Sequence, residues 1–284
     1  MQRRPFGPTL RQTAIIGQGT WRLDEGDRAS AIAALRRGLD LGMDHIDTAE
    51  MYGDAEAVIG EAMAGRRDAV FLVSKVLPGN ASRAGVQAAC ERSLSRLGTD
   101  YLDTYLLHWR GDVPLEATVR GFEDLRAAGK ILHWGVSNFD VRDLNDLADI
   151  VASAGDVGGP VCNQVLYHLQ ERAIEHAVLP WCEGANMAVV GYSPFGHGRF
   201  PRPDSPGGRV LAQVAADHGA TTPRQVALAF LTRAPPLFAI PKSASPAHAT
   251  ENAGAGDLTL SPNEVALIDR TFPLGPRPRA LPMI

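Results

Sequence analysis

The sequence has few of the features that mark metal-binding and redox proteins. It has only three cysteines, Cys90, Cys162 and Cys182, which lie far apart and form no Cys-x-x-Cys pair. This spacing excludes the common cysteine-based zinc and redox motifs and favours buried free thiols. No His-Glu-x-x-His motif or comparable cluster is present, so the sequence gives no support to metal catalysis.

Strong charge and long apolar runs are also missing. The formal net charge is -4 at pH 7, and the densest basic group is the short "RPRA" at residues 277–280, so we expect no nucleic-acid partner. No apolar run reaches the ~18–20 residues that cross a bilayer, and residues 1–17 lack the apolar core of a signal peptide. We therefore expect a cytoplasmic protein with no membrane partner.

The hydrophobic pattern alternates between two periods along the chain. Short apolar runs predict eight strands, at residues 14–20, 45–49, 69–76, 102–109, 133–138, 161–167, 188–194 and 237–243. Helical periodicity lies between them, most clearly at residues 28–42, 83–98, 115–130, 140–155 and 223–235. Strands that alternate with helices in this way predict a parallel sheet.

Eight strand–helix units with no linker between them favour a (β/α)₈ barrel, an α/β fold, as a single domain over residues 1–284. An open doubly wound sheet is the alternative, but it should carry a Gly-x-Gly-x-x-Gly turn after its first strand. Here Gly17 and Gly19 are followed by Arg22 at the third position, so this fingerprint fails. The long unpatterned stretch at residues 194–208 is expected to be a loop on the substrate side.

Four polar residues stand at or just beyond the carboxyl ends of predicted strands, where barrel enzymes have their active sites. They are Asp47, Tyr52, Lys75 and His108. Each alone fits an ordinary structural role, such as a turn cap or a core histidine. Together they form a device that protonates an anion, because a lysine cation lowers the pKa of tyrosine from ~10 toward neutrality. Reduction of a carbonyl by hydride produces such an anion.

These residues belong to a series of motifs that appear in order: "HIDTAEMYG", "VSK", "YLLHW", "WGVSNF", "GYSP" and "IPKS". From about residue 15 to residue 252 the sequence closely resembles the aldo-keto reductase family, in particular its bacterial aldehyde or methylglyoxal reductases. The resemblance implies a (β/α)₈ barrel and reversible hydride transfer between NADPH and an aldehyde or ketone. It assigns Tyr52 as proton donor, Lys75 and Asp47 as the pair that lowers its pKa, and His108 as the group that orients the carbonyl.

The resemblance also implies where a nicotinamide cofactor binds. It assigns the carboxamide to Ser137, Asn138 and Gln164, the stacked ring to Tyr192, and the pyrophosphate-side loop to Ser193, Phe195 and Gly196. It assigns the adenosine 2'-phosphate to Lys242 and Ser243, and the adenine to Glu251 and Asn252. One position departs from the family pattern, because His248 stands where an arginine is common. A histidine is mostly neutral at pH 7 and has no bidentate fork, so we expect NADPH but consider NADH possible.

The substrate is less strongly indicated than the cofactor. Trp21, Met51 and Trp109 follow strands and are expected either to wall a carbonyl site or to pack in the core. A short first loop suggests an open pocket for small aldehydes, including methylglyoxal-like dicarbonyls. The sequence predicts neither an oligomeric state nor a conformation for residues 271–284.

Two other functions remain open. Lys75 at a strand end is also the residue that a Schiff-base lyase would use, although this leaves Lys242, Asn138 and Gln164 unexplained. A nicotinamide-binding redox sensor or accessory subunit with weak turnover is the non-enzymatic alternative.

Overall fold

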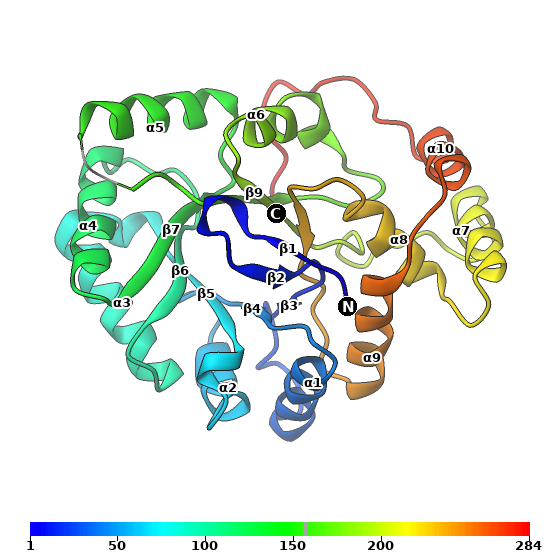
Figure 1. The fold of residues 1–284 in the computed structure, drawn as a ribbon, viewed down its shortest axis with the longest axis horizontal. Coiled ribbons are helices and arrows are strands. Elements are labelled where there is room, and N and C mark those ends of the chain that lie inside the picture. Colours follow the sequence, from blue (N-terminus) through cyan, green and yellow to red (C-terminus); the bar gives the residue numbers. More distant parts are fainter. Residues whose placement is uncertain (156–157) are drawn as a thin grey trace.

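A computed structural model describes residues 1–155 and 158–284, and its centre is a ring of eight parallel strands (Figure 1). The strands are β3 (Gln18–Gly19), β4 (His45–Asp47), β5 (Phe71–Val76), β6 (Leu102–Leu107), β7 (Ile131–Ser137), β8 (Cys162–Leu166), β9 (Ala188–Tyr192) and β10 (Leu237–Ala239). Neighbours in the sheet follow chain order from β3 to β10. Each predicted strand range contains or overlaps one of these strands.

The ring closes between the first and the last of these strands. Isolated parallel bridges join Ile16 to Ala239 and Gly19 to Lys242, and the Gly17 backbone N–H donates to the Ala239 carbonyl at 2.8 Å. Closure leaves the sheet without a free edge. The predicted (β/α)₈ barrel is therefore confirmed, and the open doubly wound sheet is excluded.

Helices surround the ring of strands (Figure 1). They are α1 (Arg28–Asp40), α2 (Ala55–Ala62), α3 (Arg83–Leu97), α4 (Leu115–Ala127), α5 (Val141–Ser153), α6 (Val178–Gly184), α7 (Pro206–Asp217), α8 (Pro223–Leu231), α9 (Pro246–Gly254) and α10 (Pro262–Thr271). The five clearest periodic stretches correspond to α1, α3, α4, α5 and α8. Gly42, with φ +88°, follows the end of α1 in the left-handed conformation that commonly ends a helix. The predicted loop at residues 194–208 is too long, because α7 begins at Pro206.

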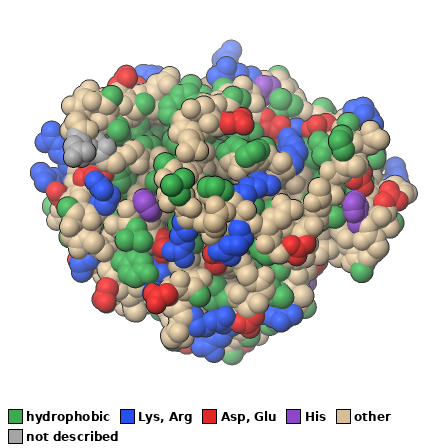
Figure 2. Space-filling model, in the orientation of Figure 1, with side chains coloured by type: hydrophobic (Ala, Val, Ile, Leu, Met, Phe, Trp, Pro, Cys, Tyr) green, Lys and Arg blue, Asp and Glu red, His purple; other side chains and the backbone are tan. Residues whose placement is uncertain are grey.

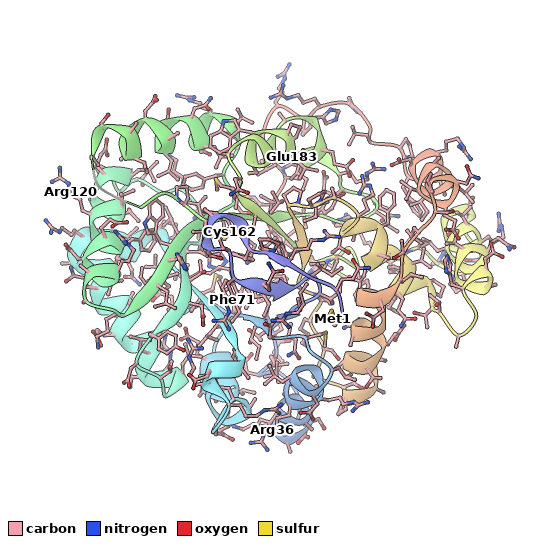
Figure 3. The ribbon with its side chains drawn as sticks, in the orientation of Figure 1. Met1, Arg36, Phe71, Arg120, Cys162 and Glu183 are labelled. Atoms are coloured by element: carbon pink, nitrogen blue, oxygen red, sulfur yellow. The ribbon has the colours of Figure 1, made fainter. Side chains whose placement is uncertain are left out.

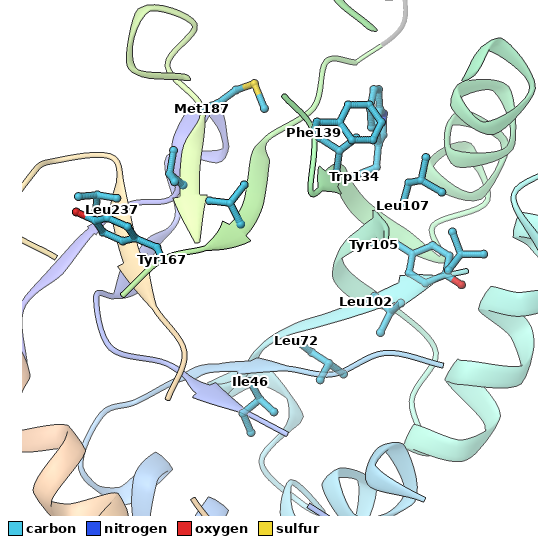
Figure 4. Packing of buried hydrophobic residues seen from close by; sticks show 14 of the residues in the cluster. Ile46, Leu72, Leu102, Tyr105, Leu107, Trp134, Phe139, Tyr167, Met187 and Leu237 are labelled. Carbon is cyan, nitrogen blue, oxygen red and sulfur yellow. The ribbon is translucent and has the colours of Figure 1, made fainter. Parts of the chain in front are cut away.

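Strand alternation divides the core into two layers. Side chains such as Ile46, Leu72 and Tyr105 point outward and pack under the helices (Figure 4). Their neighbours Phe71 and Leu106 point inward and fill the barrel. Because successive side chains alternate between these layers, the residues on either side of Ile46 must face the barrel interior.

A hairpin closes the amino-terminal end of the barrel. Strands β1 (Arg3–Pro5) and β2 (Gln12–Ala14) lie across the ring in Figure 1, and Phe6 between them packs on Phe71 and Phe238. The carboxyl end of the strands is thus the end left for a functional site.

Basic and acidic side chains are interspersed over the face seen in Figure 2, without a large area of either sign.

The expected thiol state is confirmed, since Cys90, Cys162 and Cys182 are all free and buried. Within the described ranges, no group of three or more histidine, cysteine or acidic side chains is placed to hold a metal ion. No helix of residues 1–155 or 158–284 has the length and apolar character needed to span a bilayer.

The carboxylate of Asp103 joins the hairpin to the barrel, and its loss should destabilise the fold. It accepts from Arg11 at 2.6 Å, from Arg67 at 2.8 Å and from the Leu72 backbone N–H at 2.9 Å, and is 1% exposed. Asp103→Ala leaves two cations and a buried N–H without this partner, so we expect a loss of about 3–5 kcal/mol in the free energy of unfolding. Urea denaturation measures it, with the exposed Asp68→Ala as control; equal stability of the two variants would contradict this role.

Candidate active site

A cavity of about 510 Å³ opens at the carboxyl end of the barrel strands. Thirteen of the predicted site residues line it: Trp21, Asp47, Met51, Tyr52, His108, Trp109, Ser137, Asn138, Gln164, Tyr192, Ser193, Phe195 and Lys242. Lys75 lies behind the wall and is fully buried. The remaining predicted residues do not line the cavity: Gly196, Ser243, His248, Glu251 and Asn252.

The Asp47 carboxylate and the Lys75 ammonium form a buried ion pair inside the barrel. Asp47 ends β4 and faces inward, as strand alternation requires, and Lys75 lies on the neighbouring β5. Lys75 Nζ donates to Asp47 Oδ1 at 2.5 Å and to the Thr48 carbonyl at 2.7 Å. Both side chains are at most 2% exposed, so each charge depends on the other for its compensation.

This pair keeps Lys75 charged. Burial alone lowers the pKa of Lys75, but the negative charge of Asp47 and the Tyr52 hydroxyl raise it, and the net pKa lies above its ordinary value. Burial raises the pKa of Asp47, while Lys75 and Gln164 act against this rise. A permanent cation therefore lies just beneath the cavity floor.

Gln164 completes the surroundings of Asp47 from the other side of the barrel. Its Nε2 donates to Asp47 Oδ2 at 2.7 Å, across a separation of 117 residues in the sequence. Sequence reasoning assigned Gln164 to the cofactor carboxamide and missed this contact. No described group donates to its Oε1, and the residue lines the cavity, so this oxygen remains an acceptor for a ligand.

The loop after β4 carries Tyr52 over the cavity. Gly53 has φ +54° and permits the turn at this point, while the Asp54 backbone N–H donates to Asp24 at 3.0 Å. Lys75 Nζ lies 5.0 Å from the centroid of the Tyr52 ring, and the ring meets His108 edge-on at 5.7 Å. The phenol is thus held between the buried cation and the imidazole.

The net direction of the Tyr52 pKa differs from the expectation. Burial raises this pKa, the Lys75 charge lowers it, and the result lies above the ordinary value. The expected lowering toward neutrality is therefore wrong for this structure, because the cost of burying a phenolate outweighs the effect of Lys75. Tyr52 remains a protonated phenol at neutral pH, which is the form that a proton donor requires.

His108 is a neutral side chain in the cavity wall. Burial and then the Lys75 charge lower its pKa to about 3. Its Nδ1 is enclosed and has no hydrogen-bond partner, so Nε2 is the nitrogen available to a ligand. The tautomer with its proton on Nε2 directs an N–H into the cavity, where a substrate oxygen can accept it.

Two of the predicted carboxamide-binding residues, Ser137 and Asn138, form a network with Tyr192 at the ends of β7 and β9. Asn138 Nδ2 donates to the His108 carbonyl at 3.0 Å and to Ser137 Oγ at 3.1 Å. Its Oδ1 accepts from the Tyr192 hydroxyl at 2.9 Å, which fixes that ring in the wall. The Asn138 amide thus uses both its NH₂ group and its oxygen in hydrogen bonds within the protein, and these bonds orient the neighbouring side chains.

Two of these strand-end positions have unusual backbones. Asn138 has φ +60° and Ser193 has φ +51°, both in the left-handed region that non-glycine residues seldom adopt. Such conformations cluster at ligand sites. Their presence at the ends of β7 and β9 makes this part of the cavity a candidate ligand site.

The predicted adenosine residues other than Lys242 lie beyond the cavity, on and around α9. Ser243 Oγ accepts from the Ser245 backbone N–H at 3.0 Å and shapes the turn into the helix. Glu251 accepts from Thr222 Oγ1 at 2.7 Å, so it is fixed against the start of α8. His248 is exposed in the first turn of α9.

The substrate-side wall is apolar, and sequence reasoning found only part of it. Trp21 and Met51 are 37% and 46% exposed, which excludes the alternative that they are core residues. Trp21 also stacks on His197 with ring centroids 5.0 Å apart. His197, from the predicted substrate-side loop, and the tail residues Met283 and Ile284 line the cavity as well, and no motif named any of the three.

A comparison with family descriptions decides the class of protein. The sequence model of the family described as "Aldo/keto reductase family" matches residues 15–272 of this chain. The chain belongs to this family. The predicted family and reaction class are confirmed, and the protein is an oxidoreductase of carbonyl compounds.

The similar proteins align with nearly the whole length of this aldo/keto reductase. Methylglyoxal reductase YeaE of Escherichia coli K12 is 45% identical over 275 residues, which cover 95% of this chain and 94% of that protein. Glyoxal reductase of Bacillus subtilis is 31% identical over 271 residues, covering 94% and 92%. An aldo-keto reductase from Klebsiella pneumoniae, solved in complex with NADPH, superposes with a TM-score of 0.91 at 44% identity and covers 100% of this chain and 99% of that one.

The buried histidines of the barrel should make stability depend on pH. His45 is fully buried beneath the Asp47–Lys75 pair, where burial and then the Lys75 charge lower its pKa to about 3, as for His108. An unfolded chain takes up these protons near pH 6.5, so stability is full above that pH and falls as the pH drops toward 3. Each histidine contributes roughly 1 kcal/mol per pH unit to this loss.

His45→Gln removes one of these groups, so the loss of stability between pH 7 and pH 4.5 should shrink by about 2–3 kcal/mol. Urea denaturation at a series of pH values measures the difference. Above pH 7.5 the curves of the two proteins should run parallel, which is the internal control. Parallel curves down to pH 4.5 as well would contradict a neutral buried His45.

Proposed function

We propose that this aldo/keto reductase reduces small aldehydes, including dicarbonyls such as methylglyoxal, with NADPH as hydride donor and Tyr52 as proton donor. The observation that carries the proposal is the position of the Tyr52 phenol in the cavity wall, beside the neutral His108 and directly above the buried Asp47–Lys75 pair.

The groups around the cavity fit a nicotinamide nucleotide. Gln164 Oε1 is an acceptor for a carboxamide N–H, and the Tyr192 ring, fixed by Asn138, is a flat surface for the nicotinamide. Lys242 supplies a cation at the end of β10 for a phosphate. NADPH is the cofactor, as expected from the sequence, and it is the molecule named in the Klebsiella complex.

Bound NADPH supplies the hydride that reduces the carbonyl carbon. His108 Nε2–H donates a hydrogen bond to the carbonyl oxygen and so orients the substrate in front of Tyr52. As negative charge grows on that oxygen, the Tyr52 hydroxyl transfers its proton to it.

The buried pair acts on the phenolate that this transfer leaves behind. Lys75 is charged and lies 5.0 Å from the Tyr52 ring centroid, so it stabilises the phenolate after the proton has left. Asp47 keeps Lys75 charged and in place, and Gln164 keeps Asp47 in place. In the direction of alcohol oxidation, the same phenolate accepts the proton.

The two alternatives have weaker support. A Schiff-base lyase requires a neutral lysine amine that reaches the substrate, whereas Lys75 is charged, 0% exposed and absent from the cavity wall. A redox sensor requires only the cofactor site, so it leaves the positions of Tyr52 and His108 at the cavity without a role. We retain the sensor as the second candidate for the test below.

The proposed substrate class rests on the wall and the volume of the cavity. A volume of about 510 Å³ that also receives the nicotinamide leaves room for a small carbonyl compound. Trp21, Met51, Trp109 and Met283 make the outer wall apolar. The names of the Escherichia coli and Bacillus subtilis relatives, methylglyoxal reductase and glyoxal reductase, agree with small dicarbonyls.

We further propose that residues 1–284 act as one catalytic domain in the cytoplasm. The residues that line the cavity come from many parts of the chain, the first being Gly19 and the last Ile284. Segments far apart in the sequence therefore contribute to the same site. Three buried free thiols suit a reducing compartment.

The test compares the wild type with Tyr52→Phe in the oxidation of NADPH and NADH by glyoxal, methylglyoxal and small monoaldehydes at pH 7. We expect kcat to fall about 10²–10⁴-fold in the variant, because the proton donor is lost. NADPH binding, followed by fluorescence, should survive.

Tyr105→Phe is the matched control, since it removes the same hydroxyl from a buried tyrosine whose Oη has no hydrogen-bond partner and which packs on Phe122 under the helices. Its activity should equal that of the wild type. A wild type that binds NADPH but turns over none of the aldehydes would support the sensor, and full activity in Tyr52→Phe would refute the proposed acid.

A further inference from the structure

The candidate site for the 2'-phosphate lacks a second cation on α9. Lys242 lines the cavity at the end of β10, but His248 is exposed in the first turn of α9 and does not line it. The His248 backbone N–H donates to the cap residue Ser245, and no described contact directs its ring toward Lys242. A phosphate at this place would have one lysine and no guanidinium from this segment.

An exposed arginine on the neighbouring helix lies beside the cavity wall. Arg224, in the first turn of α8, has its Cζ 5.7 Å from the centroid of the Phe195 ring and 5.1 Å from that of Phe200. Phe195 is itself a wall residue of the cavity. The exposed guanidinium therefore lies next to two aromatic rings at the edge of the cavity, although Arg224 itself is not a lining residue.

The start of α8 is fixed to the candidate adenosine segment on both sides of Arg224. Thr222 Oγ1 donates to the Glu251 carboxylate at 2.7 Å, and Gln225 Nε2 donates to the Glu251 carbonyl at 2.9 Å. Arg224 lies between these two residues in the sequence. Arg224 thus projects from a helix turn that is hydrogen-bonded to α9, and its guanidinium lies near Phe195 of the cavity wall.

Arg224 differs from other stacked arginines of this protein in having no anion. Arg172 and Arg233 lie on the Phe230 ring at 5.0 Å and 4.0 Å, and both form ion pairs with Glu175. Over residues 1–155 and 158–284, the side chain of Arg224 makes no hydrogen bond or ion pair. A guanidinium stacked on aromatic rings keeps its N–H edges free, and those edges match a phosphate in bidentate fashion.

We propose that Arg224 is a specificity-determining residue for the cofactor and that it binds the 2'-phosphate of NADPH together with Lys242, in place of an arginine at position 248. Lys242 supplies a point charge and Arg224 supplies the bidentate fork. This inference rests on the proposed assignment of Lys242 to the 2'-phosphate.

The test is direct binding to the full-length enzyme without substrate. Arg224→Gln should raise the Kd for NADPH, measured by nucleotide fluorescence, about 10-fold or more, as expected for the loss of a hydrogen-bonded charge. The Kd for NADH, which has no 2'-phosphate, should change less than about 2-fold. Arg224→Lys keeps the charge without the fork and should fall between the two proteins.

Two ligands without nicotinamide separate this inference from the proposed function. Adenosine 2',5'-bisphosphate should bind the wild type more tightly than AMP does, and Arg224→Gln should remove most of that difference. Arg120→Gln is the matched control, because this exposed arginine lies on α4, on the opposite side of the barrel from α8 (Figure 3), and should behave as the wild type.

Each outcome decides the inference. Selective weakening of the 2'-phosphorylated ligands supports it, whereas unchanged affinity or equal weakening of NADPH and NADH overturns it. Equal weakening would indicate an adenine contact or a packing role for Arg224. A wild type that binds none of the nucleotides would instead refute the proposed NADPH site itself.

Discussion

The buried carboxylate of Asp47 is the constraint on which the site depends. A charge inside a barrel is stable only if its partners compensate it, and Asp47 has two, Lys75 from the adjacent strand and Gln164 from across the ring. These contacts fix the ammonium near the Tyr52 ring and hold the Gln164 amide in the cavity wall. One buried anion thereby positions both the cation beneath the proposed acid, Tyr52, and the proposed carboxamide acceptor, Gln164.

Sequence reasoning succeeded where one strand determines the result. Asp47 lies inside because side chains alternate along its strand, and the predicted strand ends were enough to gather it with Tyr52 and His108. It failed where distant segments meet. The Gln164–Asp47 contact requires barrel closure over 117 residues, and the net pKa of Tyr52 depends on how deeply the fold buries the phenol.

The helices that the periodicity missed had a different signal. Three of them start with a serine cap followed by proline, at Ser205–Pro206, Ser245–Pro246 and Ser261–Pro262. This pair satisfies a free backbone N–H and presets the first helical turn. The approach of residues 283–284 to the cavity had no such local signal, because the tail is irregular and its position is set by the surfaces that it meets.

The stacking of Trp21 on His197 has an optical consequence. The chain has four tryptophans, and two of them, Trp21 and Trp109, line the cavity. An indole held against an imidazole emits differently from one in water, so a molecule that enters and disturbs this contact alters the ultraviolet emission of the protein. The mouth of the cavity therefore carries its own chromophore, and occupancy can be followed in the native chain without a label.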